Sequence, residues 1–327
     1  MDSGSGNAVS RIVRGSWRLP NVGVLVPLIL LWIALALSTN TFLTLFNLNN
    51  IAIQVAVIGA LALGTTPAII CREIDLSIGA IEGLCAVIAG ICAIQLSLPW
   101  GVAIMISLAT GALVGILNGA IVVYLGVPSF VTTLAMLGII SGISLTLTGG
   151  QSLYGFPDNY QWLGQGKLLG IGVPVFIGTV ILIAAQFMMR STILGLAFYS
   201  VGGNDRAAAL VGVPVRRTKI IAFMLSGLGA AIAGVLVSAR LNSANPTYGT
   251  LDLLDAIAAV VIGGVALSGG VGTAVGTATG VLLIVTIRNG LNLLGVNPFI
   301  QQTAIGGMIL IAALIDHLSR AKNRGSR

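Results

Sequence analysis

Residues 51–94 of the chain read IAIQVAVIGALALGTTPAIICREIDLSIGAIEGLCAVIAGICAI, and this stretch decides the fold. It contains two apolar runs, 51–71 and 75–94, and a helix needs about 20 apolar residues to cross a bilayer core of about 30 Å. Arg72, Glu73 and Asp75 place three charges between the runs, with no real loop to hold them. The stretch therefore predicts two membrane helices joined by a charged break.

The rest of the chain has the composition of a polytopic membrane protein. Of the 327 residues, 56% are apolar and 8% are charged, and the mean hydropathy is +1.04. A soluble globular protein carries about 25% charged residues, so this chain has too few to cover a surface that faces water. We therefore expect an all-α polytopic membrane protein, and we exclude two or three soluble domains.

Apolar runs and the breaks between them predict about ten transmembrane helices. Asn47–Asn50, Pro99, Gly126–Pro128 and Asn297–Pro298 are among the breaks. The Gly-rich region 253–289 also allows a broken or re-entrant segment. The predicted spans are 22–38, 51–71, 75–94, 101–124, 127–147, 171–189, 220–239, 253–268, 271–289 and 299–318.

The basic residues predict how these spans are oriented. With ten crossings and a cytoplasmic N-terminus, 13 of the 16 basic residues lie inside, and only Lys167, Arg240 and Arg288 lie outside. The positive-inside rule then assigns both termini to the cytoplasm and explains the net charge of +7 without nucleic-acid binding. We expect a cytoplasmic tail over 1–20, a transmembrane domain over 21–320 and a second cytoplasmic tail over 321–327. The long apolar span after the N-terminal tail favours a retained first helix over a cleaved signal peptide.

Similar landmarks in the two halves of the chain suggest a 5+5 inverted repeat. The fourth span ends near Asn118-Gly119, and Gly126–Phe130 opens the fifth. In the same way, the ninth span ends near Asn289-Gly290, and Gly295–Phe299 opens the tenth. An odd number of spans in each copy inverts the second copy, a frequent plan in transporters. The alternative is that Asn-Gly and Pro are ordinary turn residues. Ladders of glycine at 111/115/119 and 272/276/280 instead indicate close helix packing.

The charged break of the opening stretch has two compatible interpretations. Asp75, Gly79 and Glu82 have i, i+4, i+7 spacing, which would place them on one face of the third span. In one interpretation they line a transport pathway, because charges at membrane depth usually face a cavity or a partner. In the other, Glu73 and Asp75 stabilise a helix N-terminus, with Arg72 as their partner.

The polar loop 190–219 contains a candidate docking helix. Asn204 or Asp205 can cap a short helix that starts at Arg206 and ends at Gly212. A short Ala-rich helix buries little against its own chain and needs a partner, for which a cytosolic protein is the natural choice. The alternative is a basic connector, held at anionic lipid headgroups by three cations. These are Arg216, Arg217 and Lys219.

Two further segments limit the chemistry of the chain. The outer segment 239–249 precedes Asp252 and Asp255, and it is either a gate or partner surface or a capped turn with an Arg240–Asp pair. The glycine run 263–273 lacks the Gly-Lys-Ser/Thr end of a phosphate loop, so we expect a tight turn there and no nucleotide site.

No cofactor or metal site is expected, because one His and three Cys leave no room for a multi-His or Cys₄ cluster. His317 is read as structural, and Cys71, Cys85 and Cys92 as small core residues without a disulfide. We also find no acid/base dyad or nucleophile–base arrangement that would support an enzyme.

Taken together, several stretches resemble the permease family of bacterial sugar-uptake ABC transporters, the ribose/xylose/arabinose type. The resemblance covers about residues 19–320, although Val265-Ala266-Leu267 departs from the Thr-Ser-Leu of many relatives. The matching stretches are EIDLSIG at 73–79, LNG at 117–119, PSFVTTL at 128–134, residues 202–212 and LDAIAAVVIGG at 254–264.

The resemblance implies the partners and the mechanism. It implies a multi-pass protein of the bacterial inner membrane, driven by a cytosolic ABC ATPase and supplied by a periplasmic solute-binding protein. A second permease copy, identical or a sister chain, completes the pathway, which opens by alternating access. Family members carry pentoses, hexoses, inositol, the autoinducer-2 signal or nucleosides. The segment expected to contact the ATPase comprises Gly202, Asn204, Arg206, Ala207, Ala208 and Gly212, and replacing Ala208 with Asp is expected to abolish uptake.

The sugar pathway needs paired donors and acceptors in a chain that is otherwise short of polar groups. The rival functions are an ion-coupled secondary transporter, in which Asp75 and Glu82 relay protons or bind Na⁺, and a membrane scaffold without transport. The pathway candidates are Glu73, Asp75, Ser77, Glu82, Asn118, Ser129, Phe130 and Asp255.

Overall fold

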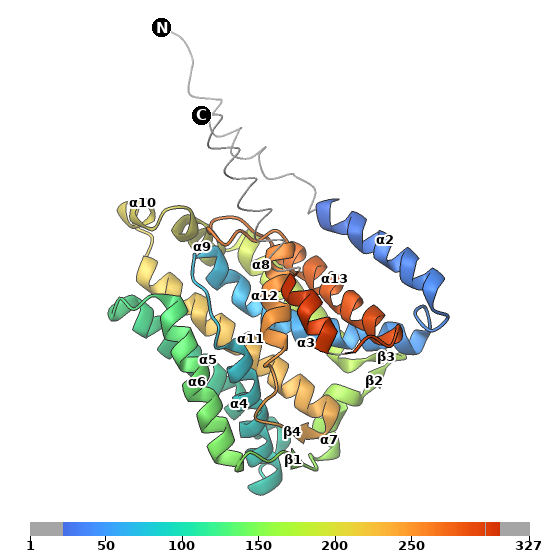
Figure 1. Ribbon diagram of the computed structural model, residues 1–327. Coiled ribbons are helices and arrows are strands. Elements are labelled where there is room, and N and C mark those ends of the chain that lie inside the picture. Colours follow the sequence, from blue (N-terminus) through green and yellow to red (C-terminus); the bar gives the residue numbers. More distant parts are fainter. Residues whose placement is uncertain (1–21, 298, 308–327) are drawn as a thin grey trace.

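The computed structural model describes residues 22–297 and 299–307, which form a helical bundle with four very short strands (Figure 1). The elements are α2 (Val22–Ser38), α3 (Leu45–Ile70), α4 (Ile78–Gly90), the π-helix η1 (Ile91–Gln95), α5 (Trp100–Tyr124), α6 (Ser129–Thr148), β1 (Leu153–Tyr154), α7 (Asp158–Gln165), β2 (Lys167–Leu168), β3 (Ile171–Gly172), α8 (Val173–Ser191), α9 (Ile193–Gly203), α10 (Asp205–Leu210), α11 (Val215–Leu241), β4 (Ser243–Ala244), α12 (Asp252–Ile262) and α13 (Ala274–Leu293).

Most of the predicted spans are helices at the expected places. Within the described residues, seven helices are long and apolar enough to cross a membrane. They are α3, α4 with η1, α5, α6, α8, α11 and α13. The expected first span, 22–38, is the apolar helix α2, which has 17 residues. These helices establish an all-α polytopic membrane protein.

The predicted span 253–268 forms a helix only in its first part. Helix α12 has 11 residues, and at 1.5 Å per residue its length is about 16 Å, too short for a bilayer core of about 30 Å. It ends at the glycine pair Gly263-Gly264, where Gly264 has a φ of +87°. The chain then turns back at 265–273, so the tight turn expected there is confirmed.

The last predicted span, 299–318, is helical over 299–307, and its remainder lies outside the described residues. So do the two expected tails, 1–20 and 321–327, and His317.

The long helices run back and forth between two ends of the molecule. One end carries α9, α10, the start of α11 and the 263–273 turn, and we call it the α10 end. The other end carries α7 and the pair formed by β1 and β4, and we call it the α7 end. Figure 1 shows α10 and α7 at opposite ends of the bundle.

The centre of the bundle is α11, which packs against α3, α4 and α5. A Cβ at Gly111 or Gly227 would meet backbone oxygen of the other helix, so α5 and α11 touch through their main chains. Gly280 meets the backbone of Ala259 in the same way and joins α13 to α12. Without a hydrophobic driving force in lipid, such close approach is a main source of helix association. The predicted role of the glycine ladders is confirmed for these positions, although Gly272 precedes α13.

Two non-helical segments enter the bundle from opposite ends. Residues 72–77 follow α3 at the α10 end and lead into α4. Residues 245–251 follow β4 at the α7 end and lead into α12. The two meet where Gly79, just inside α4, touches the backbone of Gly249, because a Cβ on either glycine would clash with the other's carbonyl oxygen. We call 72–77 the first break and 245–251 the second break.

Candidate functional site

The first break is held by a buried polar network around Asp75. Asp75 Oδ1 accepts hydrogen bonds from the backbone nitrogen of Ser77 at 3.0 Å and from its Oγ at 2.6 Å. Asp75 Oδ2 accepts a bond from Ser226 Oγ of α11 at 2.8 Å. Asn118 Nδ2 of α5 donates to Ser77 Oγ at 2.8 Å. All four side chains are buried, and three of the pathway candidates, Asp75, Ser77 and Asn118, contact one another here.

Helix geometry corrects the expected common face of Asp75, Gly79 and Glu82. Helix α4 begins at Ile78, so Asp75 lies before the helix, and only Gly79 and Glu82 belong to it. The Asp75 carboxylate instead closes a short turn onto the backbone nitrogen of Ser77. Asx turns of this kind compete with helical structure, which explains why the helix starts later than hydropathy indicated.

The start of α6 satisfies the backbone of the first break. Ser129 Oγ accepts a hydrogen bond from the Ile74 nitrogen at 3.2 Å, and Thr133 Oγ1 donates to the Ile74 oxygen at 3.2 Å. Non-helical backbone at membrane depth needs such partners. Phe130, the other candidate here, is 53% exposed on the surface of the subunit.

The expected partnership of Arg72 with Glu73 and Asp75 is wrong. Glu73 pairs instead with Lys219 at the start of α11, at 2.6 Å. Arg72 donates from Nε to the Ser268 oxygen at 2.7 Å and from Nη2 to the Gly203 oxygen at 2.6 Å. A guanidinium presents several donors in a fixed fork, which lets it bridge two carbonyls from separate segments.

The second break leads into a cluster of charged side chains. Arg288 of α13 pairs with Asp255 at 2.8 Å and with Asp252 at 3.5 Å. Glu82 of α4 is fully buried and faces Asp252. Arg288 was counted with the basic residues on the outer side of the membrane, and its side chain lies between α12 and α13. The anticipated Arg240–Asp ion pair is replaced by these contacts, and Arg240 acts on Asp252 only through its nearby charge.

Side-chain hydrogen bonds fix the segment 239–249 in a turn. Asn242 has a φ of +49°, caps α11 and accepts a hydrogen bond from the Phe156 nitrogen at 2.9 Å. Tyr248 and Ser243 share a hydrogen bond of 2.6 Å, and Asn245 donates to Ser152 Oγ at 2.9 Å. Burial raises the pKa of the Tyr248 phenol, and the hydrogen bond to Ser243 opposes this shift.

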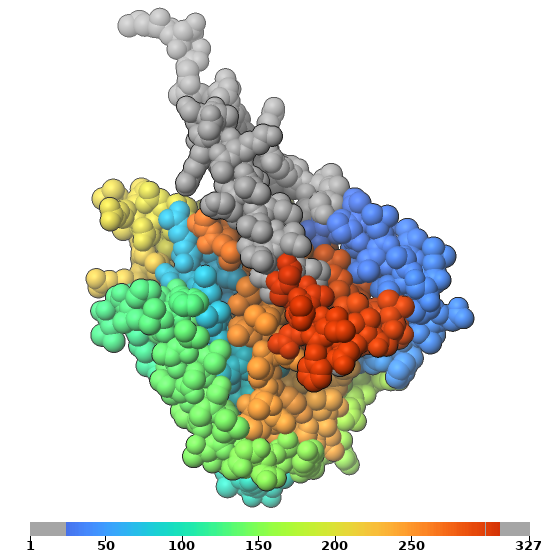
Figure 2. Space-filling model, in the orientation of Figure 1, coloured from blue at the N-terminus to red at the C-terminus, as the bar shows by residue number. Residues whose placement is uncertain are grey.

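The short helix predicted in the 190–219 loop forms, with boundaries slightly different from the prediction. Helix α10 spans Asp205–Leu210, and Asn204 Oδ1 caps it by accepting a bond from the Ala207 nitrogen at 3.0 Å. Gly212 has a φ of +86°, as expected just beyond a helix. Figure 2 shows this yellow segment at the edge of the molecule, above the green ends of α5 and α6.

Exposure divides the expected docking residues into two groups. Ala207 and Arg206 are exposed, whereas Ala208 is only 4% exposed and Gly202 packs against the Ile70 oxygen. Leu210 is 88% exposed, a position that sequence reasoning missed. An Asp at position 208 would therefore disturb internal packing, so Leu210 is the sharper probe of docking.

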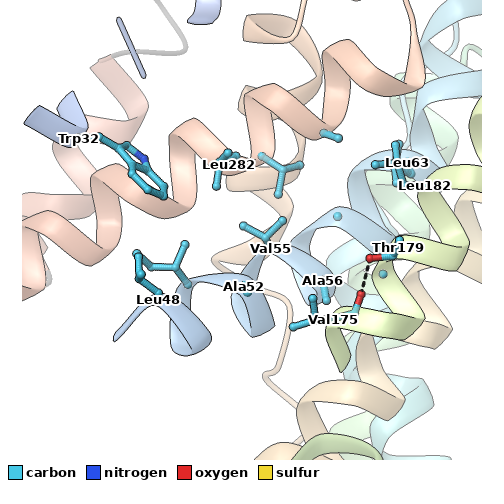
Figure 3. Close-up of a pocket in the computed structure, with 15 residues that line it drawn as sticks. Trp32, Leu48, Ala52, Val55, Ala56, Leu63, Val175, Thr179, Leu182 and Leu282 are labelled. Carbon is cyan, nitrogen blue, oxygen red and sulfur yellow. Dashed lines mark hydrogen bonds between the residues drawn. The ribbon is translucent and has the colours of Figure 1, made fainter. Parts of the chain in front are cut away.

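One groove lies beside α10, and a separate cavity lies among α2, α3, α8 and α13. A groove of about 910 Å³ lies between α10, the start of α11 and the end of α5, and Arg206, Arg216 and Arg217 contribute to its wall. A second cavity of about 360 Å³ lies between α2, α3, α8 and α13. Its wall is apolar (Figure 3), and Thr179 Oγ1 is engaged with the Val175 oxygen at 2.7 Å. A sugar needs converging polar groups, so this second cavity is unsuited to one.

Comparison with known proteins decides the family. Residues 47–314 match the family model described as the branched-chain amino acid transport system permease component. The chain belongs to this transport permease family. It is 40% identical to the ribose import permease protein of Escherichia coli K12 over 307 residues, covering 92% of this chain and 95% of that protein.

Other relatives agree in length and kind. The Bacillus subtilis 168 ribose import permease protein is 39% identical over 306 residues, covering 93% of this chain and 94% of that protein. The galactose/methyl galactoside import permease protein of Escherichia coli K12 is 35% identical over 320 residues, covering 92% and 95%. No solved structure matches the chain. Family membership and the seven long apolar helices make it a multi-pass protein of the bacterial inner (plasma) membrane.

The contacts of four further residues were not predicted from the sequence. Ser226 carries no motif, Thr133 lies within the matching stretch 128–134, and Lys219 and Arg288 entered the sequence analysis only as charges. Each contacts a residue at least 33 positions away in the sequence, as the Arg288–Asp255 pair shows. Only helix packing identifies them.

Proposed function

We propose that this chain is the pathway-forming permease of an ABC importer for a sugar or sugar-like solute. The observation that carries the proposal is the 40% identity to a ribose import permease across 95% of that protein. The subunit is not itself an enzyme. A separate cytosolic ABC ATPase supplies the energy, a periplasmic solute-binding protein delivers the solute, and a second permease copy completes the pathway.

The proposed topology has ten crossings in two inverted halves of five. Its support is the pair of breaks, which enter from opposite ends and each precede an inner helix, α4 or α12. In this scheme α12 is a half-length element, and the helix that begins at 299 is the tenth crossing.

The proposed orientation places the α10 end in the cytoplasm. Its support is that cations gather there, at Arg72, Arg190, Arg206, Arg216, Arg217 and Lys219, whereas Lys167 and Arg240 lie near the α7 end. The positive-inside rule assigns such an end to the cytoplasm.

In the proposed mechanism, ATP binding by the partner displaces α10, and rigid-body movements open the pathway first outward and then inward. The eight candidates to line or shape it remain those expected from the sequence, seven of them polar and the eighth Phe130. Of these, Asp75, Ser77 and Asn118 form the network at the first break, and Glu82 and Asp255 belong to the charged cluster that follows the second break. Groups able to bond sugar hydroxyls therefore lie beside each break. Moving the breaks apart at Gly79 and Gly249 would expose both sets.

The test of docking uses two exposed leucines at opposite ends. Leu210→Asp should abolish co-purification of the cognate ATPase, because it places a charge at the large apolar side chain of α10, which is 88% exposed. Leu169→Asp is the matched control, since Leu169 is 99% exposed in the β2–β3 turn at the α7 end. Normal ATPase binding by the Leu210 variant, with uptake retained, would refute α10 as the docking element.

A second candidate function is an ion-coupled secondary transporter. The observation that favours it is the buried Glu82 beside Asp252, since ionisable groups at membrane depth often relay protons. Uptake of radiolabelled ribose and galactose into membrane vesicles separates the two functions. Sensitivity to vanadate with indifference to a protonophore supports the ABC importer, and the reverse result supports the rival.

A further inference from the structure

Arg72 occupies a backbone position that suits glycine better. Its φ is +67°, in the left-handed region that L side chains rarely adopt. The backbone therefore gains nothing from having a side chain there. Any structural contribution of this side chain therefore comes from its guanidinium, which makes two hydrogen bonds.

Those bonds join three segments that are far apart in the sequence. Arg72 Nη2 donates to the Gly203 oxygen at 2.6 Å, at the C-terminus of α9, where unpaired carbonyls favour a cation. Arg72 Nε donates to the Ser268 oxygen at 2.7 Å, in the turn between α12 and α13. We call this three-segment contact the Arg72 junction.

Backbone contacts tighten the same junction. The Gly270 nitrogen donates to the Ile70 oxygen at 2.9 Å, and Tyr199 donates from its hydroxyl to the Gly272 oxygen at 2.8 Å. A Cβ at Gly202 would collide with the Ile70 oxygen, so α9 and the end of α3 are in direct main-chain contact. The three segments are therefore in position to move together.

The junction lies between α10, the first break and the turn that follows α12. Gly203 immediately precedes Asn204, the residue that caps α10. Arg72 opens the first break, which leads into α4, and Ser268 follows α12, which the second break precedes. One residue further on, Glu73 pairs with Lys219 and ties the same break to the start of α11.

We propose that Arg72 is a positioning residue that transmits movement of α10 to the inner helices α4 and α12. Its fork joins Gly203, the residue before the α10 cap, to Ser268 in the α12–α13 turn, and Arg72 itself opens the first break, which leads into α4. When α10 is displaced, Gly203 moves with it, and the guanidinium pulls the first break and the α12–α13 turn in the same direction. This inference rests on the proposed ABC importer function and adds the residue that couples ATP use to the pathway.

The decisive variant is Arg72→Gly, because glycine suits the left-handed backbone and the protein should fold and assemble. The full complex of permease, ATPase and binding protein is reconstituted in liposomes, and both ATP hydrolysis and uptake of radiolabelled ribose and galactose are measured. We expect hydrolysis within about twofold of wild type and uptake per ATP lower by about tenfold, a common strength of coupling between two sites. Arg72→Lys should give an intermediate ratio, because one ammonium cannot reproduce the fork.

Leu169→Gly is the matched control. Leu169 also has a positive φ, of +53°, and lies at the α7 end, so the change relaxes the backbone without touching the junction. It should leave uptake per ATP unchanged. An unchanged ratio in Arg72→Gly would overturn the inference while leaving the importer intact, and so would loss of the ATPase from the complex, which would indicate a structural role. Failure of the importer itself would appear separately, as wild-type uptake that ignores ATP.

Discussion

Both breaks place non-helical backbone inside the bundle, but different polar contacts stabilise the two regions. The first break, 72–77, is held at Asp75 by hydroxyl and amide hydrogen bonds, with Ser226 and Asn118 as the distant partners. The second break leads into ion pairs of Arg288 with Asp252 and Asp255. Removing one partner of a buried ion pair leaves an uncompensated charge, whereas removing a hydroxyl leaves a smaller deficit. The comparison therefore predicts that the second break is the more fragile of the two.

The largest effect is expected from Arg288→Gln. The change leaves Asp252 and Asp255 without their cation, so the free energy of unfolding should fall by about 3–5 kcal/mol. Thermal unfolding of the detergent-solubilised permease measures the loss. Adding Asp255→Asn should restore part of the stability, and Arg217→Gln, at an exposed cation, should have little effect. Equal stability of Arg288→Gln and wild type would contradict the ion-pair account.

The contact between Gly79 and Gly249 should be the next most sensitive to substitution. Gly79→Ala places a methyl group against the carbonyl oxygen of Gly249. Because that oxygen belongs to the main chain, rotation of a side chain cannot relieve the clash. We expect a loss of about 3 kcal/mol, at the upper end for overpacking. Gly138→Ala in α6 is the control, because its Cβ would meet open space. If both variants unfold at the same temperature, Gly79 and Gly249 are not in close main-chain contact.

A smaller loss is expected from Ser226→Ala at the first break. The change removes one donor to the buried Asp75 carboxylate, which should cost about 2 kcal/mol. Ser200→Ala, at an exposed helix serine, should change stability by less than about 0.5 kcal/mol. A loss from Ser226→Ala as large as that of Arg288→Gln would remove the distinction between the two breaks.

The smallest effect is expected outside the breaks, at the cap of α10. Asn204→Ala removes the bond to the Ala207 nitrogen and should destabilise this helix by about 1 kcal/mol. Hydrogen exchange of residues 205–211 should become faster, while exchange in α11 stays unchanged. Asn204→Asp retains a capping oxygen and should keep the wild-type rate. Identical exchange in the alanine variant would show that α10 is held by other contacts.

Hydropathy located the helices well, because the lipid phase requires apolar surface wherever a helix faces it. It extended the eighth span too far, to 268, where the glycine content of 253–289 had already allowed a break, and the helix ends before Gly263-Gly264. Docking helix α10 was found from its Asn204 cap, a local signal. Which face of α10 is exposed was not, since burial of Ala208 depends on the helices beneath it.

Charge partners were the least predictable part of the site. Proximity in sequence suggested Arg72 for Glu73 and Arg240 for Asp252, yet the structure uses Lys219 and Arg288. Both true partners belong to other helices, so their distance depends on packing rather than spacing. The polar residues of the first break were recognised because Asp75 and Ser77 stand in an apolar context, where unpaired polar groups are costly.

The central claim is that a separate ATPase binds this permease at the α10 end and drives transport by displacing α10. Its most direct test is uptake by proteoliposomes that hold the permease with the cognate ATPase and binding protein, compared with proteoliposomes that hold the permease alone. The account predicts accumulation of sugar only in the complete set, only with ATP, and none when Leu210 is replaced by Asp. Concentrative uptake by the permease alone, driven by an ion gradient, would contradict it.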